Sequence, residues 1–226
     1  MGMVESARKL LLLMKKIISN DISLSKRVSK EQISLMDYCR LAILNHENVL
    51  EGFNTYTGGK RDSTFVVKCR SVNLKEIIDK AISFSHVECK IKNITVRTWI
   101  SNAVPTSMRC IEGHVLKCVD NLLANAVKFS HPNGMVTINA TIQDSMVTVD
   151  FRDHGCGIRA KNLKRIFEYG ERGVHPEIER STIGRGVGLY VARKLARNMG
   201  GDVLVKATKL GVGTTFRLTF KCEKTN

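Results

Sequence analysis

The chain has 226 residues, of which 43% are hydrophobic, so it is long enough to form one large domain with a packed core or a domain with a smaller appendage. Its formal net charge of +15 favours partners that carry negative charge: nucleotides, nucleic acid, an acidic protein face or an anionic membrane surface. The charge alone does not choose among these partners.

Cysteine usage and hydropathy argue against a zinc-binding, a membrane-spanning or a secreted protein. Seven cysteines are scattered along the chain without a Cys-x-x-Cys pair, which argues against a zinc site and fits a reduced, cytoplasmic setting. The most apolar early run, from Leu10 to Met14, stops at Lys15, far short of the roughly 20 apolar residues of a membrane span. It also lacks the small-residue cleavage pattern of a signal peptide. We therefore expect a cytoplasmic protein without a membrane span.

Two amphipathic helices are predicted in the first part of the chain. Residues 3–20 and 31–53 carry apolar side chains at three- and four-residue steps, and a polar stretch links them. A hairpin of two such helices leaves its apolar faces partly uncovered, so pairing with a second copy into a four-helix bundle completes it. We assign residues 1–57 to an all-α helical hairpin that forms a homodimer.

The polar, glycine-rich stretch from Thr57 to Asp62 predicts a boundary, with a second domain at residues 58–226. Beyond it the periodicity is mixed, with Asn73 as a helix cap, a hairpin turn at residues 143–145 and a long polar connection at 169–186. The fold class is therefore α+β, an α/β sandwich with a mixed sheet. The predicted strands cover residues 64–70, 94–100, 136–142, 147–151, 203–205 and 216–220, and the predicted helices cover 73–84, 112–130, 162–167 and 187–199.

Asn121, Asn125 and Lys128 follow one another at steps of four and three residues, which puts them on one face of the predicted helix. An amide oxygen is a good ligand for Mg²⁺, and a lysine one turn further along can meet a phosphate. The alternative for this helix alone is an ordinary polar, solvent-exposed face.

Asp153 follows an alternating strand and precedes Gly155 and Gly157. A carboxylate at the end of a strand can accept a hydrogen bond from the exocyclic amine of adenine, and the glycines let the backbone approach the ring. The alternative is a simple Asp-Gly turn.

Two further glycine clusters follow in the chain. Gly184, Gly186 and Gly188 precede a predicted helix, where backbone N–H groups and the positive helix end favour phosphate. In the last cluster, Thr214 and Thr215 can supply hydroxyls to a base or to a water beside it, although strand threonines are common without such a role.

Together these motifs, with Ile166-Phe167-Glu168 between them, resemble the ATP-binding domain of sensor histidine kinases, within the GHKL ATPase superfamily, over residues 64–220. The resemblance implies a two-layer α/β sandwich of the GHKL type, with ATP and Mg²⁺ as cofactors and a mobile loop at residues 169–186 over the nucleotide. It departs from the family at Gly170, where many members carry a second Phe. It implies Asn125 on Mg²⁺, Asn121 beside the reacting phosphate, Lys128 on phosphate, Asp153 on adenine, Arg172 near the γ-phosphate, and Gly155, Gly157, Ile158, Gly184, Gly186, Gly188, Leu189 and Thr215 around the nucleotide.

Other nucleotide-binding motifs are not found. The chain contains no G-x-x-x-x-G-K-[ST] sequence, so the site is not a P-loop. The glycines also lack the βαβ unit with a distant acidic residue that marks a dinucleotide-binding fold.

The phosphate acceptor of the family is missing from its usual place. In the family a histidine on the first hairpin helix is followed by an acidic residue and then by a proline, whereas residues 1–30 contain neither histidine nor proline. His46, followed by Glu47, is the candidate acceptor, but it lies in the second predicted helix, on its apolar stripe. A histidine packed in the helical bundle is the competing interpretation.

We expect a protein-histidine kinase of a two-component system, which binds Mg-ATP and acts on a response-regulator receiver protein. Two alternatives remain open. One is an adaptor that binds ATP and a response regulator without phosphorylating itself. The other is nucleic-acid binding driven by the charge, against which four tyrosines and the single Trp99 form no aromatic-basic platform.

Overall fold

The structure is a computed structural model that describes residues 69–171 and 186–224. These residues belong to the second of the two compact units of the chain, Phe65–Asn226. The helical hairpin predicted for residues 1–57 lies outside the described residues, as do residues 64–68 of the first predicted strand. The boundary at residue 58 stays a prediction.

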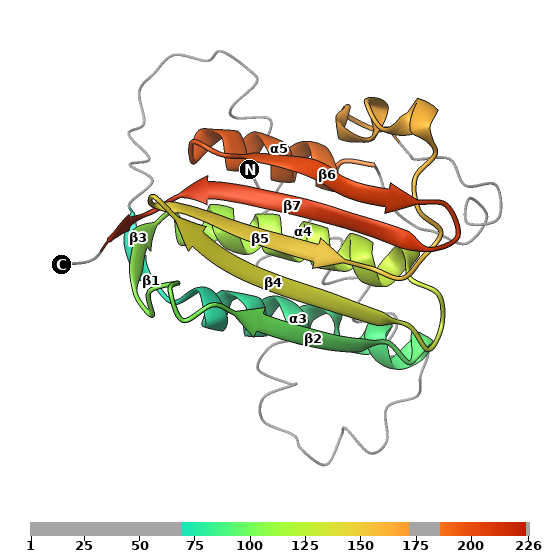
Figure 1. The fold of residues 1–226 in the computed structure, drawn as a ribbon, viewed down its shortest axis with the longest axis horizontal. Helices are drawn as coiled ribbons and strands as arrows, with labels where there is room; N and C mark the ends of the chain where they lie inside the picture. Colours follow the sequence, from blue (N-terminus) through green and yellow to red (C-terminus); the bar gives the residue numbers. More distant parts are fainter. Residues whose placement is uncertain (1–68, 172–185, 225–226) are drawn as a thin grey trace, which may run out of the picture. The chain divides into compact units, whose positions relative to one another are not determined.

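A five-stranded mixed sheet forms the centre of the second unit (Figure 1). Its strand order is β2-β4-β5-β7-β6, in which β2 and β4 are parallel and the other neighbours are antiparallel. The mixed sheet expected from the sequence is thus confirmed. The strands are β2 (Thr95–Ile100), β4 (Met135–Gln143), β5 (Met146–Arg152), β6 (Asp202–Lys209) and β7 (Gly213–Lys221).

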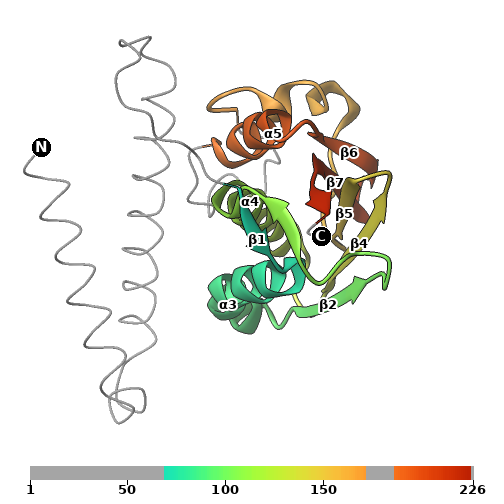
Figure 2. The same ribbon diagram turned by 90° about the vertical axis from the view of Figure 1, so that its left-hand side faces the viewer.

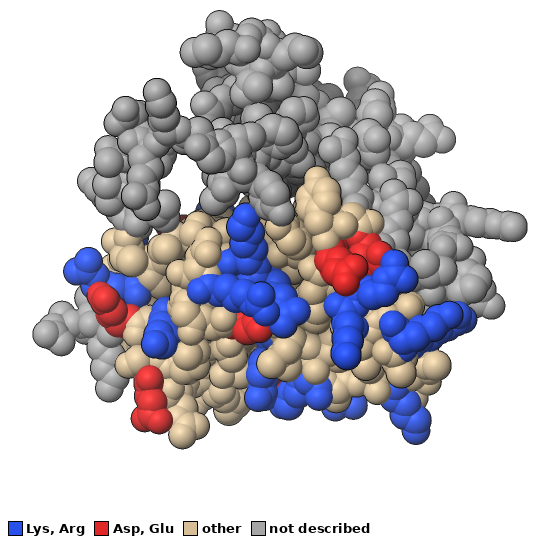
Figure 3. All heavy atoms as spheres, turned by 90° about the horizontal axis from the view of Figure 1, so that it is seen from above, with Lys and Arg blue, Asp and Glu red and all other residues tan. Residues whose placement is uncertain are grey.

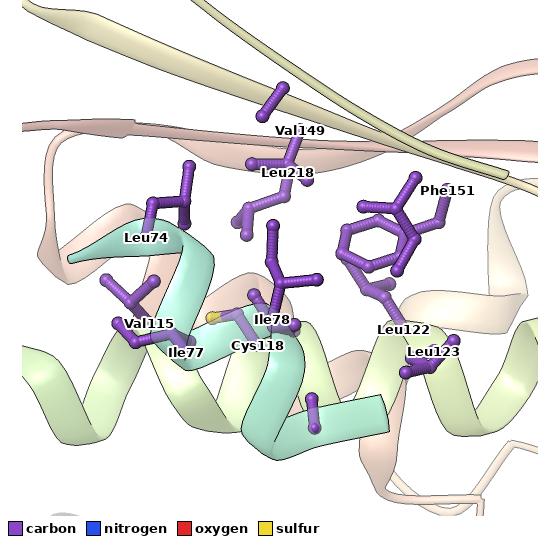
Figure 4. Packing of buried hydrophobic residues seen from close by; sticks show 14 of the residues in the cluster. Leu74, Ile77, Ile78, Val115, Cys118, Leu122, Leu123, Val149, Phe151 and Leu218 are labelled. Atoms are coloured by element: carbon purple, nitrogen blue, oxygen red, sulfur yellow. The ribbon is translucent and has the colours of Figure 1, made fainter. Parts of the chain in front are cut away.

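Three helices cover one face of this sheet, namely α3 (Leu74–Lys92), α4 (Glu112–Phe129) and α5 (Gly188–Asn198), as Figure 2 shows. The core lies between the two layers. Val149, Phe151 and Leu218 point from the sheet towards Ile78 of α3 and Leu122 of α4, and all five are completely buried (Figure 4). The alternation of apolar residues along each strand places them on this one face. The fold is therefore a two-layer α/β sandwich.

A small second sheet joins β1 (Arg70–Val72), β3 (Met108–Cys110) and β8 (Glu223–Lys224) in antiparallel pairs. Neither β3 nor β8 was predicted, and β1 lies at the end of the strand expected at residues 64–70. The helix predicted at residues 162–167 is instead a pair of single 3₁₀ turns, η2 (Ala160–Asn162) and η3 (Arg165–Phe167).

Local signals set the ends of several elements. The Asn73 side chain accepts a hydrogen bond from the Lys75 N–H and caps α3, as predicted, but the helix runs eight residues beyond Phe84 to Lys92. Asp144 and Ser145 both have positive φ, which matches a two-residue hairpin turn between β4 and β5. None of the helices in the described part of the chain is long and apolar enough to cross a membrane.

Candidate nucleotide-binding site

The three polar residues of α4 lie together on one half-buried face of the helix, as their spacing predicted. The neighbours Leu122, Leu123, Ala126 and Val127 face the core and fix the rotation of the helix. The Asn121 side-chain nitrogen is buried and has no hydrogen-bond partner among the described residues. A buried amide donor without a partner costs about 1–3 kcal/mol, so this atom is suited to a ligand.

Asn121 of α4 meets the start of α5. A Cβ added to Gly188 would lie 3.1 Å from the Asn121 side-chain oxygen. The α5 helix begins at Gly188 with no side-chain cap and no acidic residue in its first turn. The structure therefore brings the asparagine helix and the second glycine cluster together.

Asp153 lies at the end of β5 and is only 4% exposed. The Thr214 N–H donates to its carboxylate at 3.0 Å, and the Asp153 N–H donates to the Thr214 carbonyl at 2.9 Å. Burial raises the pKa of the Asp153 carboxyl to about 6, although the hydrogen bond from Thr214 and the nearby His154 act in the opposite direction. This carboxylate is held in place, and it is harder to ionise than an exposed one.

The glycines of the first and last clusters allow three close backbone approaches. A Cβ at Gly155 would lie 1.9 Å from the Phe129 carbonyl oxygen at the end of α4. At Gly157, where φ is +70°, a Cβ would lie 2.3 Å from the Lys209 carbonyl oxygen. At Gly213, where φ is +138°, it would lie 2.1 Å from the Asp153 carbonyl oxygen. Only glycine fits at these positions. The loop after β5 is therefore packed against the end of α4 and the β6–β7 hairpin.

Three threonines lie near Asp153, and their side chains lie on different faces of the sheet. Thr214 is 5% exposed, shares its face with Phe216, and its hydroxyl lies 3.1 Å from the Thr208 hydroxyl. Thr208 also accepts a hydrogen bond from the Ile158 N–H at 2.9 Å. Thr214 and Thr215 were both expected near the nucleotide. Strand alternation puts the Thr215 side chain on the opposite face of the sheet from Thr214, so only Thr214 shares the helix-covered face with Phe216.

Thr208 was not foreseen as part of the site. It lies 50 residues from Ile158 along the chain, and the pairing of β6 with β7 places it beside Thr214. The faces of Thr214 and Thr215 could have been predicted from the sequence. Thr214 is separated by two, four and six residues from the apolar Phe216, Leu218 and Phe220, and alternate residues of a strand lie on the same face.

The Ile166-Phe167-Glu168 segment packs against α5 and β7. Ile166 is buried, the Phe167 ring packs edge-on against Phe216 with centroids 6.5 Å apart, and the Arg193 guanidinium lies 4.6 Å over the Phe167 ring. These contacts hold η3 against the sheet and α5. Gly170, the departure from the family pattern, has a φ of +75°, and no atom of the described residues lies within 4 Å of a Cβ added there.

Parts of the expected site lie outside the described residues. These are Arg172, Gly184 and most of the connection at residues 169–186, together with His46. Gly186 is described, with a φ of +67° and its backbone against the Glu171 carbonyl. Leu189 is half-buried in the first turn of α5 and packs against the core.

The described residues contain no group of three or more His, Cys, Asp or Glu that could hold a metal ion. The six described cysteines are free thiols.

Comparison with known proteins agrees with this geometry. The profile of the family described as "Histidine kinase-, DNA gyrase B-, and HSP90-like ATPase" matches residues 110–224. The aerobic respiration control sensor protein ArcB of Escherichia coli is 38% identical over 100 residues, which cover 44% of the chain and 13% of ArcB. The sensor-like histidine kinase SenX3 of Mycobacterium bovis is 30% identical over 149 residues, which cover 65% of the chain and 35% of SenX3. The chain thus spans a minor part of the length of these relatives.

Solved structures show the same fold. The full-length ShkA structure in complex with AMPPNP superposes with a TM-score of 0.64 at 24% identity, covering 88% of the chain and 40% of ShkA. The mycobacterial sensor histidine kinase MprB superposes with a TM-score of 0.56 at 21% identity, covering 70% of the chain and 99% of that structure. Since the family profile matches half of the sequence, the chain belongs to the family of histidine kinase-, DNA gyrase B- and HSP90-like ATPases, with sensor histidine kinases as its relatives.

Proposed function

We propose that the chain binds Mg-ATP in this site and transfers the γ-phosphate to a histidine in two-component signal transduction. The observation that supports it most is that distant segments meet along α4. Asn121 lies against Gly188 at the start of α5, and the loop that follows Asp153, itself bonded to Thr214, packs through Gly155 against the Phe129 carbonyl at the end of α4. Such a site needs backbone approaches that only glycine allows, and the chain has glycines at those positions.

The adenine end of the site is assigned to Asp153. Its buried carboxylate accepts a hydrogen bond from Thr214 through one oxygen, which leaves acceptor capacity for the exocyclic amine of adenine. The complex of ShkA with AMPPNP, an adenine nucleotide, supports this choice of ligand.

The phosphate end is assigned to α4 and the start of α5. The Asn121 side-chain nitrogen, which has no partner among the described residues, can donate to a phosphate oxygen. The first turn of α5, which no described side chain caps, favours an anion, and the Asn125 amide oxygen is of the type that Mg²⁺ prefers. The bound nucleotide would supply the phosphoryl group and bring the metal. Lys128 lies in the last turn of α4, where its ammonium can meet phosphate, and this ammonium lies 5.4 Å from the centre of the Phe129 ring.

Isothermal titration of the full chain tests nucleotide binding. We expect Mg-ATP to bind the parent chain, Asn125→Ala to weaken binding mainly when Mg²⁺ is present, and Asp153→Asn to weaken it with or without the metal. The proposal is wrong if the parent shows no binding, or if both variants bind Mg-ATP as the parent does.

A second candidate function is an adaptor that binds ATP and a response regulator without phosphorylating itself. The observation in its favour is the lack of histidine and proline in residues 1–30. Incubation with γ-labelled ATP separates the two functions. Acid-labile label that disappears in His46→Ala supports autophosphorylation at His46, whereas binding of ATP without any label supports the adaptor.

The partners we propose are a second copy of the chain, through the hairpin at residues 1–57, and a response-regulator receiver protein. Lys and Arg side chains are spread over the face shown in Figure 3, with only scattered Asp and Glu among them. This surface, with the net charge of +15, favours an acidic protein partner and speeds its association at low salt.

A further inference from the structure

The end of α4 carries more backbone carbonyls than the helix itself can satisfy, because the last four carbonyls of any α-helix lack an N–H partner within the helix. Here the Lys92 ammonium of α3 donates to three carbonyl oxygens, those of Val127 at 2.9 Å, Lys128 at 2.5 Å and Ser130 at 2.8 Å. All three donors of one ammonium group are thus used on one helix end.

The remaining carbonyls at this end have other partners. The Ser130 N–H and hydroxyl both donate to the Ala126 carbonyl, at 3.1 and 2.7 Å, and the Cys156 N–H donates to the Phe129 carbonyl at 3.3 Å. Lys92 also accepts a hydrogen bond, since the Asn133 N–H, just beyond the end of α4, donates to the Lys92 carbonyl at 2.8 Å. Lys92 therefore ties the last turn of α4 to α3, while Cys156 ties it to the loop after Asp153.

The charges around Lys92 suit this arrangement. A cation at the C-terminal end of a helix is stabilised by the helix dipole. Partial burial lowers the pKa of Lys92, while Glu88, one turn earlier on α3, favours the charged form and lies within electrostatic range of Lys128 as well. Replacing the ammonium with an apolar group would leave three carbonyls of a part-buried helix end without their donor.

We propose that Lys92 is a positioning residue for the nucleotide site, which acts by fixing the end of α4 and hence the direction of Asn121, Asn125 and Lys128. The inference rests on the proposed binding of Mg-ATP and adds to it a residue that lies on a different helix from those assigned to the nucleotide. Its effect falls mainly on the phosphate and metal end of the ligand, because α4 carries Asn121, Asn125 and Lys128 directly. The adenine end is held by Asp153 and Thr214 through β5 and β7, and it meets the end of α4 only through the loop after Asp153.

The test compares Lys92→Met and Lys92→Arg in the full chain, with affinity measured by displacement of a fluorescent ATP analogue. Loss of a hydrogen-bond partner behind a metal ligand typically weakens metal binding about 10-fold or more. By analogy, since Lys92 holds the end of the helix that carries Asn125, we expect Lys92→Met to weaken Mg-ATP binding by roughly tenfold. Adenosine affinity should change by less than about twofold, since adenosine lacks the phosphates that α4 meets. Lys92→Arg keeps a cationic donor at the helix end and should recover most of the Mg-ATP affinity.

Arg217→Met provides the matched control for a general loss of stability. Arg217 also uses its charged group in part-buried hydrogen bonds, at 2.7 and 2.8 Å to Asp150, but on the face of the sheet away from the helices. It should lower the thermal unfolding temperature and leave Mg-ATP affinity unchanged.

Three outcomes separate the possibilities. If the parent binds Mg-ATP and Lys92→Met binds it equally well, Lys92 does not position the site, and the proposed function still stands. Equal losses for ATP and adenosine, or a matching loss in Arg217→Met, would reduce Lys92 to a residue of general stability and overturn the inference. If the parent fails to bind Mg-ATP, the proposed function itself is wrong.

Discussion

Asp153 combines burial with a raised pKa, and this gives the proposed adenine contact a pH dependence. The carboxyl has a pKa of about 6 in the folded chain against an ordinary value of 3.8. In the ligand-free protein the stability that its neutral form confers is full below about pH 4 and is lost as the pH rises through 6. Nucleotide affinity has the opposite pH dependence and rises as the pH rises through 6, because the adenine amine donates to the ionised carboxylate.

We therefore predict that Mg-ATP affinity is constant above about pH 7 and falls below pH 6, approaching about tenfold per pH unit. Titrations between pH 5 and 8 measure this. Asp153→Asn should bind more weakly and lose the step near pH 6. Asp150→Asn is the matched control, since Asp150 lies on the same strand but is paired with Arg217 and Lys206 on the other face of the sheet. A step that survives in Asp153→Asn would assign it to another group.

Replacement by Ala should have opposite effects on the unfolding free energy at Gly155 and at Gly113. At Gly155 a Cβ would overlap the Phe129 carbonyl, so Gly155→Ala must push the loop after β5 away from α4. We expect a loss of about 1–3 kcal/mol in unfolding free energy, with weaker nucleotide binding. Gly113 lies in the first turn of α4, and no atom of the described residues lies within 4 Å of a Cβ added there. Gly113→Ala should therefore raise the unfolding free energy by about 0.5–1 kcal/mol. Urea unfolding of both variants checks the pair, and a neutral Gly155→Ala would contradict the close approach.

At the scale of the elements, the start of α3 rests on one side-chain cap. The Asn73 oxygen accepts from the Lys75 N–H at 2.9 Å, and Asn73 itself is in extended conformation. Asn73→Ala should lower the unfolding free energy by about 1 kcal/mol, whereas Asn73→Gly should lower it by only a few tenths. Urea unfolding measures both. An unchanged unfolding free energy in Asn73→Ala would mean that the cap contributes little.

The predicted elements that hold are those whose signal is local. Alternation over seven or more residues in β4, β5 and β7 fixes both the strand and its buried face, and Asp144 and Ser145 mark the turn between two of them. The end of α3 was placed too early because its second half buries the small residues Ser85 and Cys89, which carry little apolar signal. Small side chains suit a helix packed closely on its neighbours, but periodicity in hydropathy does not detect them.

Elements with distant partners were missed. β3 has three residues and pairs with β8, more than one hundred residues further along the chain, so no local pattern marks either strand. The same limit applies to the site. The glycine clusters and Asp153 are readable because their types and spacing are unusual, whereas Lys92 and Thr208 act through contacts that only the packing of α3 on α4 and of β6 on β7 creates.

At the scale of the whole molecule, the proposed site predicts a coupling between nucleotide binding and folding. A ligand that binds only the folded state stabilises it by about 2.7 kcal/mol at a concentration of 100 times its Kd. For a chain of about 150–250 residues each kcal/mol raises Tm by roughly 2–4 °C. Saturating Mg-ATP should therefore raise Tm of the full chain by about 5–10 °C in differential scanning fluorimetry.

The net charge of +15 offers a competing cause for such a shift, because any polyanion is attracted to this surface. Two controls separate the causes. GTP has the same charge but presents a carbonyl where adenine presents its amine, so it should give a smaller shift than ATP if Asp153 reads the base. Contacts within a half-buried site are screened less than exposed ones, so the ATP shift should persist in 0.5 M salt, where the Debye length is only a few Å. Equal shifts for ATP and GTP that both vanish in salt would point to surface charge rather than to the site around Asp153 and Asn121.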